Sequence, residues 1–436
     1  MNTTLSATSA TLAPAERWAR HWPGLQQALE HCAARVPLYR GVDAAGGLAA
    51  FPVLTKARLR SAFPHQLVPE GERLPDAVKS GRVMFVGTSG TEGERVQVLW
   101  HQPWWDAQEV DGFAPHALAA MLVHQTGYKE AVLTTPVCSG NLCHVGKLPM
   151  ADRIDGRTLF LNQTADPALW KDDDVRRMAD ELDAFAPAAL EADPAYLAHF
   201  AVRLLRLGRR PHLPRFIDLS YSLPSRHHLA TIAAGFPGVP LIDAYGSTEC
   251  GFVFCACDRG AFHPNPGWTH AEALPLAERG LEGVARLLVT TLNNPWLNLV
   301  RFDTGDLVRP RTAGPCPCGR DDGLVLDSVE GRTSDLLVAT DGRLVTPRAV
   351  DRALAGEGAL VHWRLTQQGP AEFELQLVES GLAPLDPAAV AASIEPVLGA
   401  RPRTRVVRSA PVEASGKLRL CKALHVDVAT LVGAST

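Results

Sequence analysis

The stretch Asp243-Ala244-Tyr245-Gly246-Ser247-Thr248-Glu249 carries the strongest indication of the fold. It continues the apolar segment 240–244, which we expect to be a short strand, into small and polar residues. Open α/β sheets bind ligands where their strands end. An aromatic ring beside a glycine can lie against a nucleobase, a threonine can donate to phosphate, and a carboxylate can hold Mg²⁺. Alone, the stretch is equally consistent with a turn that exposes Glu249.

An earlier segment has the composition of a phosphate-binding loop. Gly87-Thr88-Ser89-Gly90-Thr91-Glu92-Gly93-Glu94 follows the short apolar run 83–86. Small residues allow backbone N–H groups to approach phosphate oxygens closely, and the hydroxyls add donors. The segment lacks the Gly-Lys-Ser/Thr ending of a Walker loop, and by itself it is more typical of an ordinary turn.

Three segments nearer the C-terminus complete the set. Arg301-Phe302-Asp303-Thr304-Gly305-Asp306-Leu307 offers a carboxylate at a glycine turn, which can accept hydrogen bonds from both hydroxyls of a ribose. An Asx-type turn between two strands is the alternative for this segment. The other two are Gly331-Arg332-Thr333-Ser334-Asp335 and Ser415-Gly416-Lys417, whose lysine would ordinarily be a solvated surface group.

In this order, the five segments resemble the adenylate-forming superfamily, most closely its phenylacetate–CoA ligase-like branch. The resemblance spans residues 50–420 and implies an α/β fold in two domains. A large N-terminal adenylation domain with mixed β-sheets and helices is expected over 15–332, and a small mobile α+β domain over 335–436, after a flexible tail at 1–14. The alternation of strand-like and helix-like stretches independently favours a mixed or parallel sheet with helices on its faces.

The resemblance also implies a role for each matching residue. The loop residues Thr88, Ser89, Gly90, Thr91 and Gly93 would cradle the phosphates of ATP. Tyr245 would lie against adenine, with Gly246 and Ser247 beside it in the nucleotide site. Thr248 would contact the α-phosphate, and Glu249 would bind Mg²⁺. Asp306 would bind the ribose, with Arg332 beside it. Asp335 would be the interdomain hinge, and Lys417 would stabilise charge during adenylate formation.

An enzyme of this kind activates a carboxylic acid as an acyl-AMP and passes the acyl group to a thiol. On family grounds the acid is aryl or arylacetic, and coenzyme A is the expected acceptor. A carrier protein or an amine is the alternative acceptor. Mg²⁺ and a lysine ammonium offset the charge that develops on the phosphate groups in such a reaction.

Two departures from the family pattern motivate a rival interpretation. The family loop commonly has Lys-Pro where this chain has Glu94-Arg95, and Phe302-Asp303 replaces its Tyr-Arg. A catalytically degenerate, zinc-stabilised binding protein is therefore the alternative from another functional class. The retained residues at the other motif positions argue against it.

A second group of residues has the composition of a zinc site. Cys257-x5-His263 precedes Cys316-x-Cys318, and cysteine and histidine at short spacing can supply four tetrahedral ligands to Zn²⁺. The Cys-Pro-Cys-Gly run at 316–319 resembles a knuckle of this branch, in which some members carry structural zinc. The Cys-to-His gap there is usually one residue longer, so Cys255 is an alternative ligand to Cys257. Buried, reduced thiols are the competing interpretation.

Composition limits the partners. The 436 residues include 43 Lys+Arg and 47 Asp+Glu, a net charge of −4, which argues against a nucleic-acid partner. The sequence has no run of 18 apolar residues and no signal-like segment, so we expect a cytoplasmic protein without a membrane partner. A homodimer is left open.

Two residue pairs allow narrower predictions. Trp104-Trp105 is expected to be half core and half surface, with a substrate-pocket wall as the alternative. His227-His228 is expected to be a solvated helix start.

Overall fold

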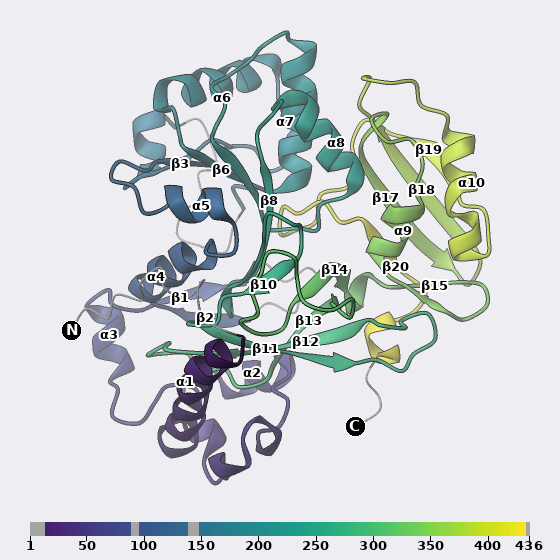
Figure 1. The fold of residues 1–436 in the computed structure, drawn as a ribbon. Coiled ribbons are helices and arrows are strands. Elements are labelled where there is room, and N and C mark those ends of the chain that lie inside the picture. Colours follow the sequence, from purple (N-terminus) through teal and green to yellow (C-terminus); the bar gives the residue numbers. More distant parts are fainter. Residues whose placement is uncertain (1–13, 89–95, 138–147, 433–436) are drawn as a thin grey trace.

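A twelve-stranded sheet dominates the computed structural model, which describes residues 14–88, 96–137 and 148–432 (Figure 1). Its strands, in spatial order, are β11 (Thr269–Pro275), β12 (Ala285–Thr291), β13 (Phe302–Pro310), β14 (Leu326–Arg332), β10 (Phe262–Pro264), β9 (Gly251–Ala256), β8 (Leu241–Ser247), β7 (Phe216–Leu219), β6 (Ala189–Ala192), β3 (Glu130–Leu133), β5 (Thr158–Phe160) and β4 (Ile154–Asp155). The predicted tail at 1–14 lies almost wholly outside the described residues.

Strand β8 joins two halves of this sheet that have different topologies. Its first residues pair with β7 in parallel, and β7, β6, β3 and β5 are all parallel to one another. From Ala244 onward β8 pairs with β9 in antiparallel fashion, and the sheet continues antiparallel to β11. The stretch singled out in the sequence therefore lies where the sheet changes from one topology to the other.

Helices cover both faces of the parallel half, and those on one face connect successive parallel strands (Figure 1). One face carries α6 (Asp172–Phe185), α7 (Pro194–Arg206) and α8 (Arg226–Gly235), and the other carries α4 (Gln102–Gly112) and α5 (Ala117–Leu122). Helix α7 begins where Asp193 accepts from the Ala195 backbone N–H, with proline at its first position. The other elements before 250 are α1 (Pro14–Arg35), α2 (Lys56–Ala62), α3 (Leu74–Lys79) and the hairpin of β1 (Met84–Gly87) and β2 (Gln97–Trp100).

A smaller sheet follows the short 3₁₀ turn Thr333–Asp335. Its strand order is β19-β18-β17-β20, and it has its own core around the fully buried Trp363. The elements of this region are β15 (Leu337–Val338), β16 (Leu344–Val345), α9 (Pro347–Ala353), β17 (Leu360–Gly369), β18 (Glu372–Glu379), α10 (Pro387–Leu398), β19 (Arg403–Val406) and β20 (Cys421–Ala423). Further 3₁₀ turns lie at Pro37–Tyr39, Ala44–Gly46, Leu48–Ala50, Met150–Arg153, Pro167–Leu169 and Val428–Leu431.

The smaller sheet packs against α7 and α8 of the large domain through β17. The prediction of a solvated His227-His228 pair is wrong, because both side chains are buried. His228 Nε2 lies 3.0 Å from His362 Nδ1 of β17, and the two rings stack. Burial lowers the pKa of His228 to about 3, so the pair is neutral and packs as part of the interface.

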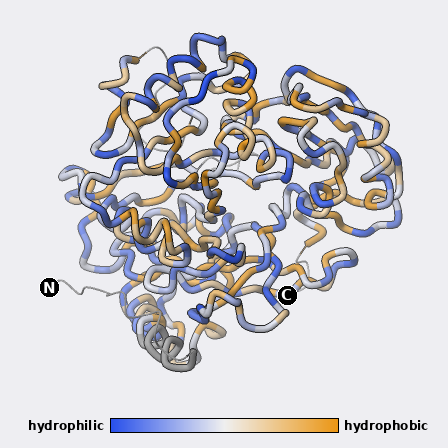
Figure 2. Tube along the Cα trace, turned by 45° about the horizontal axis from the view of Figure 1, so that its top comes forward, coloured by the Kyte–Doolittle hydropathy of each residue, from blue (hydrophilic) through white to orange (hydrophobic). Residues whose placement is uncertain are grey.

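Hydrophilic and hydrophobic residues are intermixed along the whole trace (Figure 2). Among the residues that the structure describes, no helix combines the length and apolar character needed to cross a membrane.

Candidate active site

A cavity of about 1350 Å³ is lined by residues of both the large sheet and the C-terminal region. Residues from each of the five sequence segments line it, and those among the predicted site residues are Thr88, Gly246, Ser247, Thr248, Glu249, Asp306, Arg332 and Lys417. The fold thus brings together groups that are far apart in the sequence.

The β8 stretch reaches the cavity as an extended strand. Tyr245, Gly246 and Ser247 belong to β8 itself, whereas a turn was the alternative for this stretch. A Cβ at Gly246 would lie 2.6 Å from the Gly251 carbonyl oxygen, so only glycine allows β8 and β9 to approach this closely. Glu249 follows the strand end; it is buried, and among the described residues no hydrogen bond or ion pair engages its carboxylate.

Asp306 is held between two donors. It lies within β13 rather than in a turn between strands, opposite Arg332 of β14. Its carboxylate accepts from Tyr245 Oη at 2.7 Å and from Arg332 Nε at 3.1 Å. Asp306 also raises the pKa of Arg332, which keeps the guanidinium charged. Tyr245 is not among the residues that line the cavity, and the contact observed for its hydroxyl is the hydrogen bond to Asp306. Its stacking on adenine stays a prediction.

Lys417 enters the cavity from the C-terminal region, and its ammonium donates to the Tyr221 carbonyl oxygen at 2.6 Å. Burial and the neighbouring Arg332 lower the pKa of Lys417 to about 8, against the opposing effect of nearby carboxylates. The side chain therefore stays largely charged at neutral pH, although less strongly than a solvated lysine. The interpretation of Lys417 as an ordinary surface group does not hold for this cavity position.

The turn that carries Lys417 docks tightly on the large domain. Gly416 has a φ of +80°, and a Cβ there would lie 1.8 Å from Thr135 Oγ1. The Gly416 carbonyl accepts from Tyr196 Oη at 2.7 Å. Because both a left-handed backbone and the absence of a side chain are needed, glycine at this position allows Lys417 to reach the cavity.

The segment between the two sheets is tied to the same turn. Asp335 pairs with Arg419, whose Nη2 lies 2.5 Å from Asp335 Oδ1. Arg419 is two residues beyond Lys417 and is buried. Burial raises the pKa of Asp335, with Arg419 as the main opposing influence.

Only the first residue of the predicted phosphate loop can be placed. Thr88 Oγ1 accepts from the Val96 backbone N–H at 3.0 Å, which closes the β1–β2 hairpin. The predicted positions Ser89, Gly90, Thr91 and Gly93 lie outside the described residues. The departures at Glu94-Arg95 also lie there.

The structure explains the other departure and adds two residues that sequence reasoning missed. Phe302 is fully buried in the core, and Asp303 forms an ion pair with Arg286 at the cavity. Lys56 also lines the cavity, and a Cβ at Gly305 would lie 3.3 Å from its Nζ. Neither Lys56 nor Arg286 belongs to a recognisable motif, so no local signal in the sequence could have found them.

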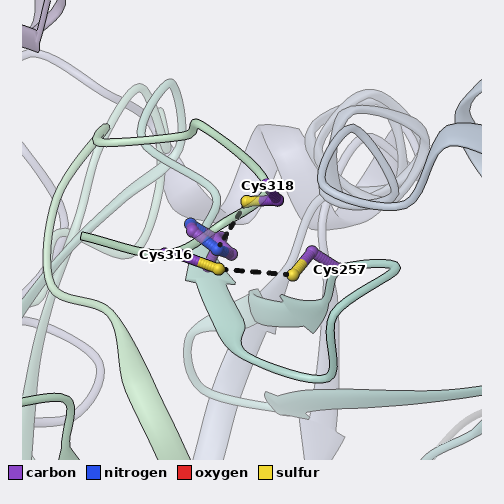
Figure 3. A group of neighbouring side chains, drawn as sticks. Cys257, Cys316 and Cys318 are labelled. Atoms are coloured by element: carbon purple, nitrogen blue, oxygen red, sulfur yellow. Dashed lines mark hydrogen bonds between the residues drawn. The ribbon is translucent and has the colours of Figure 1, made fainter. Parts of the chain in front are cut away.

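The predicted metal ligands Cys257, His263, Cys316 and Cys318 converge outside the cavity, with their ligand atoms all within 4.8 Å of one another (Figure 3). Cys257 Sγ and Cys316 Sγ are 3.8 Å apart, and Cys318 Sγ is 3.2 Å from His263 Nε2. Cys255 is not in this group; it packs with Phe113 and Phe216 in a separate hydrophobic cluster. The alternative ligand is therefore excluded by the fold.

Of the two adjacent tryptophans, Trp104 is buried and Trp105 is partly exposed, as expected. Trp104 is buried and donates to the Leu292 carbonyl oxygen, whereas Trp105 stacks on Trp100 with ring centroids 4.0 Å apart. Trp105 and Trp100 also line the cavity.

Known structures share this arrangement of elements. A crystal structure of 2-hydroxyisobutyryl-CoA ligase in the postadenylation state with R3-HIB-AMP matches with a TM-score of 0.70 and 17% identity, covering 97% of this chain and 94% of that chain. The chain has the same fold as this ligase. The predicted α/β architecture is thereby confirmed, while the phenylacetate–CoA ligase-like branch stays a prediction.

Two other matches have lower scores. An open conformation of the same ligase with 2-HIB-AMP and CoA gives a TM-score of 0.57 at 18% identity, covering 98% of this chain and 96% of that chain. The anthranilate CoA ligase AuaEII with anthranoyl-AMP gives 0.52 at 15% identity, covering 77% of this chain and 66% of that chain. No family model and no curated protein sequence matches the chain.

Proposed function

We propose that this protein uses ATP to activate a carboxylic acid as an acyl-AMP and then transfers the acyl group to a thiol, with coenzyme A as the expected acceptor. The observation that carries the proposal is the convergence of Glu249, Asp306, Arg332 and Lys417 on one cavity. Two carboxylates and two cations from four separate segments meet there inside an adenylate-forming fold. The aryl or arylacetic nature of the acid is part of the proposal and follows from the resemblance in sequence.

In the first step, a carboxylate oxygen of the acid attacks the α-phosphorus of ATP, and the bond to the leaving pyrophosphate breaks. Asp306 would accept hydrogen bonds from the ribose hydroxyls while Tyr245 and Arg332 hold it in place. Thr248 would donate to the α-phosphate from the end of β8. The Lys417 ammonium, fixed by the Tyr221 carbonyl, would offset the negative charge that develops between the acid and the α-phosphate.

The residues present suit a magnesium ion beside the phosphates. Glu249 supplies a carboxylate that lines the cavity and has no other partner among the described residues. Mg²⁺ prefers such oxygen ligands together with substrate phosphates and water, and when bound it neutralises phosphate charge. Glu249 would then hold the Mg²⁺ ion close to Thr248, the residue proposed to contact the α-phosphate.

The second step needs the cavity to open to the acceptor. Asp335, with its partner Arg419, lies between the two sheets and is proposed as the hinge. Rotation about this segment would withdraw Lys417 once the adenylate has formed and admit the thiol, which attacks the acyl carbon and expels AMP. The structure of 2-hydroxyisobutyryl-CoA ligase with 2-HIB-AMP and CoA in an open conformation supports this proposal for the fold.

The cysteine and histidine group is proposed to bind one structural zinc ion. Four tetrahedral ligands with Zn–S bonds of about 2.3 Å place two sulfur atoms about 3.8 Å apart. The distance between Cys257 Sγ and Cys316 Sγ matches that value. All four positions would be filled by protein atoms, which leaves no site for substrate and favours a role in stability.

The experiment that tests the proposal measures pyrophosphate release with Mg-ATP against aryl, arylacetic, fatty and amino acids, each with and without CoA. Acid-dependent release is the expected result, and a CoA thioester as product identifies the acceptor. Release that stops after one equivalent per chain would instead indicate a carrier protein or an amine. If no acid gives release and calorimetry detects no binding of Mg-ATP, the degenerate binding-protein interpretation replaces this proposal.

A further inference from the structure

Three carboxylates, those of Glu109, Glu130 and Glu191, line the part of the cavity formed by the parallel half of the sheet, and a fourth, that of Asp218, is buried beside Glu191. Glu130 is on β3, Glu191 on β6, Asp218 on β7, and Glu109 on the covering helix α4. The strand register pairs Val132 with Glu191 and Glu191 with Asp218. Paired residues of parallel strands share a face, and Glu130 lies two residues before Val132, so the three strand carboxylates point to the same side.

Among the described residues, hydroxyl groups supply the hydrogen bonds that this acidic group accepts. Glu130 accepts from Thr158 Oγ1 at 2.7 Å, and Glu191 accepts from Ser220 Oγ at 3.0 Å. Asp218 is only 2% exposed, and both of its carboxylate oxygens are buried without a hydrogen-bond partner. Glu109 lines the cavity, and no hydrogen bond or ion pair engages it among the described residues.

Burial and mutual repulsion both disfavour the charged forms of these carboxyl groups. Burial is the main cause that raises the pKa of Glu109 and of Asp218 well above the usual range, and mutual repulsion among the four carboxylates adds to it. Burial likewise raises the pKa of Glu191 to about 7. Arg157 also lines the cavity and lowers the pKa of Glu109, an effect smaller than those of burial and of the neighbouring Glu130 and Glu191. These raised pKa values mean that the charged forms of the carboxyl groups are disfavoured as the cavity stands. A positive charge placed beside them would favour the charged forms and would therefore be bound.

Tyr221 fixes the distance between this acidic group and the reacting centre. Its backbone carbonyl accepts from Lys417 Nζ, and its hydroxyl donates to Glu191. The length of one tyrosine residue therefore separates the Lys417 ammonium, proposed to lie beside the reacting carboxylate, from the acidic group at Glu191. An α-ammonium lies next to its own carboxylate and would not reach that far, whereas a group at the opposite end of an elongated acid would.

We propose that the acid activated by this protein carries a cationic group, such as an ammonium, at the end distant from its carboxylate. This proposal rests on the proposed function, because it specifies the chemical group at the far end of the acid that the protein would activate. Glu109 and Glu191, which line the cavity, would bind the cation, Asp218 would add negative charge beside Glu191, and Thr158 keeps Glu130 in place next to them. Neutral acids of the same shape would leave these carboxylates buried and unpaired, so the protein would discriminate against them.

The test compares matched acids by pyrophosphate release and by calorimetry. The pairs are 4-(aminomethyl)benzoate with 4-ethylbenzoate, and 6-aminohexanoate with heptanoate. In each pair the ammonium acid is expected to have at least a tenfold higher kcat/KM for pyrophosphate release and at least tenfold tighter binding. The Glu109→Gln/Glu191→Gln variant should lose this preference, because its amides bear no charge. Glu357→Gln, at an exposed position of the C-terminal region, is the matched control and should keep it.

The two readouts separate this proposal from the one on which it rests. Pyrophosphate release that is equal or faster with the neutral acids would overturn the cationic end while leaving acid activation in place. If no acid gives release, acid activation fails, and calorimetry with the same pairs still decides the present proposal. Equal binding of charged and neutral acids, or a preference that survives in the double variant, would overturn it.

Discussion

The two ends of the cavity are built in different ways. The end proposed to bind the nucleotide, called the nucleotide end below, consists of short contiguous segments, each at or beside a strand end, such as the β8 stretch and the turn that carries Lys417. The end proposed to bind the acid, called the acid end below, consists of single side chains that the sheet register and one helix bring together, such as Glu130, Glu191 and Glu109. A nucleotide presents the same phosphates and ribose to every enzyme of this kind, whereas the acid differs. A fixed sequence motif can therefore form the nucleotide end, whereas the acid end is formed by single residues from separate elements.

The largest expected effect concerns the nucleotide end. Lys417→Ala should reduce acid-dependent pyrophosphate release by about 100-fold or more, the loss typical of a preorganised group that stabilises developing charge. Binding of a preformed acyl-adenylate should change little, because no phosphate charge develops after the adenylate has formed. Calorimetry with the adenylate measures the second quantity. Unchanged pyrophosphate release in this variant would show that the assigned role of Lys417 is wrong.

A neighbouring substitution separates the charge of Lys417 from its delivery to the cavity. Gly416→Ala places a Cβ 1.8 Å from Thr135 Oγ1 and requires an alanine at a φ of +80°, so the turn should dock poorly. Pyrophosphate release should fall about tenfold or more, although Lys417 is intact. Gly358→Ala is the control, since Gly358 has a φ of +82° in the same C-terminal region but no atom within 4 Å of its Cβ position. Equal loss in the two variants would mean that backbone strain, not docking, causes the effect.

The pH dependence of catalysis tests whether the charge of Lys417 is needed. Because the pKa of Lys417 is lowered to about 8, the charged form that the reaction needs is lost as the pH rises above that value. The kcat/KM for ATP, which reports ionisations of the free enzyme, should be about tenfold lower at pH 9 than at pH 7. Lys417→Arg should flatten this limb of the profile, since a guanidinium stays charged throughout. A limb that persists in Lys417→Arg would assign the titration to another group.

The smallest expected effect on catalysis comes from the metal group, which lies outside the cavity. Wild-type protein purified without added metal should contain about one zinc per chain, and Cys316→Ser/Cys318→Ser should contain almost none and unfold at a lower temperature. Pyrophosphate release at a temperature where the variant remains folded should stay within about twofold of wild type. Elemental analysis and thermal unfolding give the two readouts. Full zinc content and unchanged stability in the variant would remove the zinc proposal.

This comparison also explains what the sequence could predict. The α/β fold and the groups Asp306, Arg332 and Lys417 were predictable because each lies in a contiguous segment with a local chemical logic. The convergence of Cys257, His263, Cys316 and Cys318 was predictable from spacing, whereas zinc binding stays a prediction. Only the fold decided between Cys257 and Cys255, because Cys255 packs in a hydrophobic cluster. The burial of His228 could not be predicted, since it depends on the docking of β17 from more than a hundred residues away.

The acid end could not be predicted for a related reason. Glu130, Glu191 and Asp218 each look like an ordinary strand residue, and no local pattern links them. They meet because β3, β6 and β7 are neighbours in one parallel sheet with a particular register. A one-residue shift in that register would turn each side chain to the opposite face, so their chemistry exists only at the level of the sheet.

Detection of the acyl-adenylate itself tests the central claim most directly. The protein would be mixed with Mg-ATP and the acid that gives the fastest pyrophosphate release, without any acceptor, and the products analysed by mass spectrometry. The account predicts an acyl-AMP that contains the intact acid, formed at up to one equivalent per chain in wild type and almost absent in Lys417→Ala. Tight binding of Mg-ATP without acyl-AMP from any acid would contradict it.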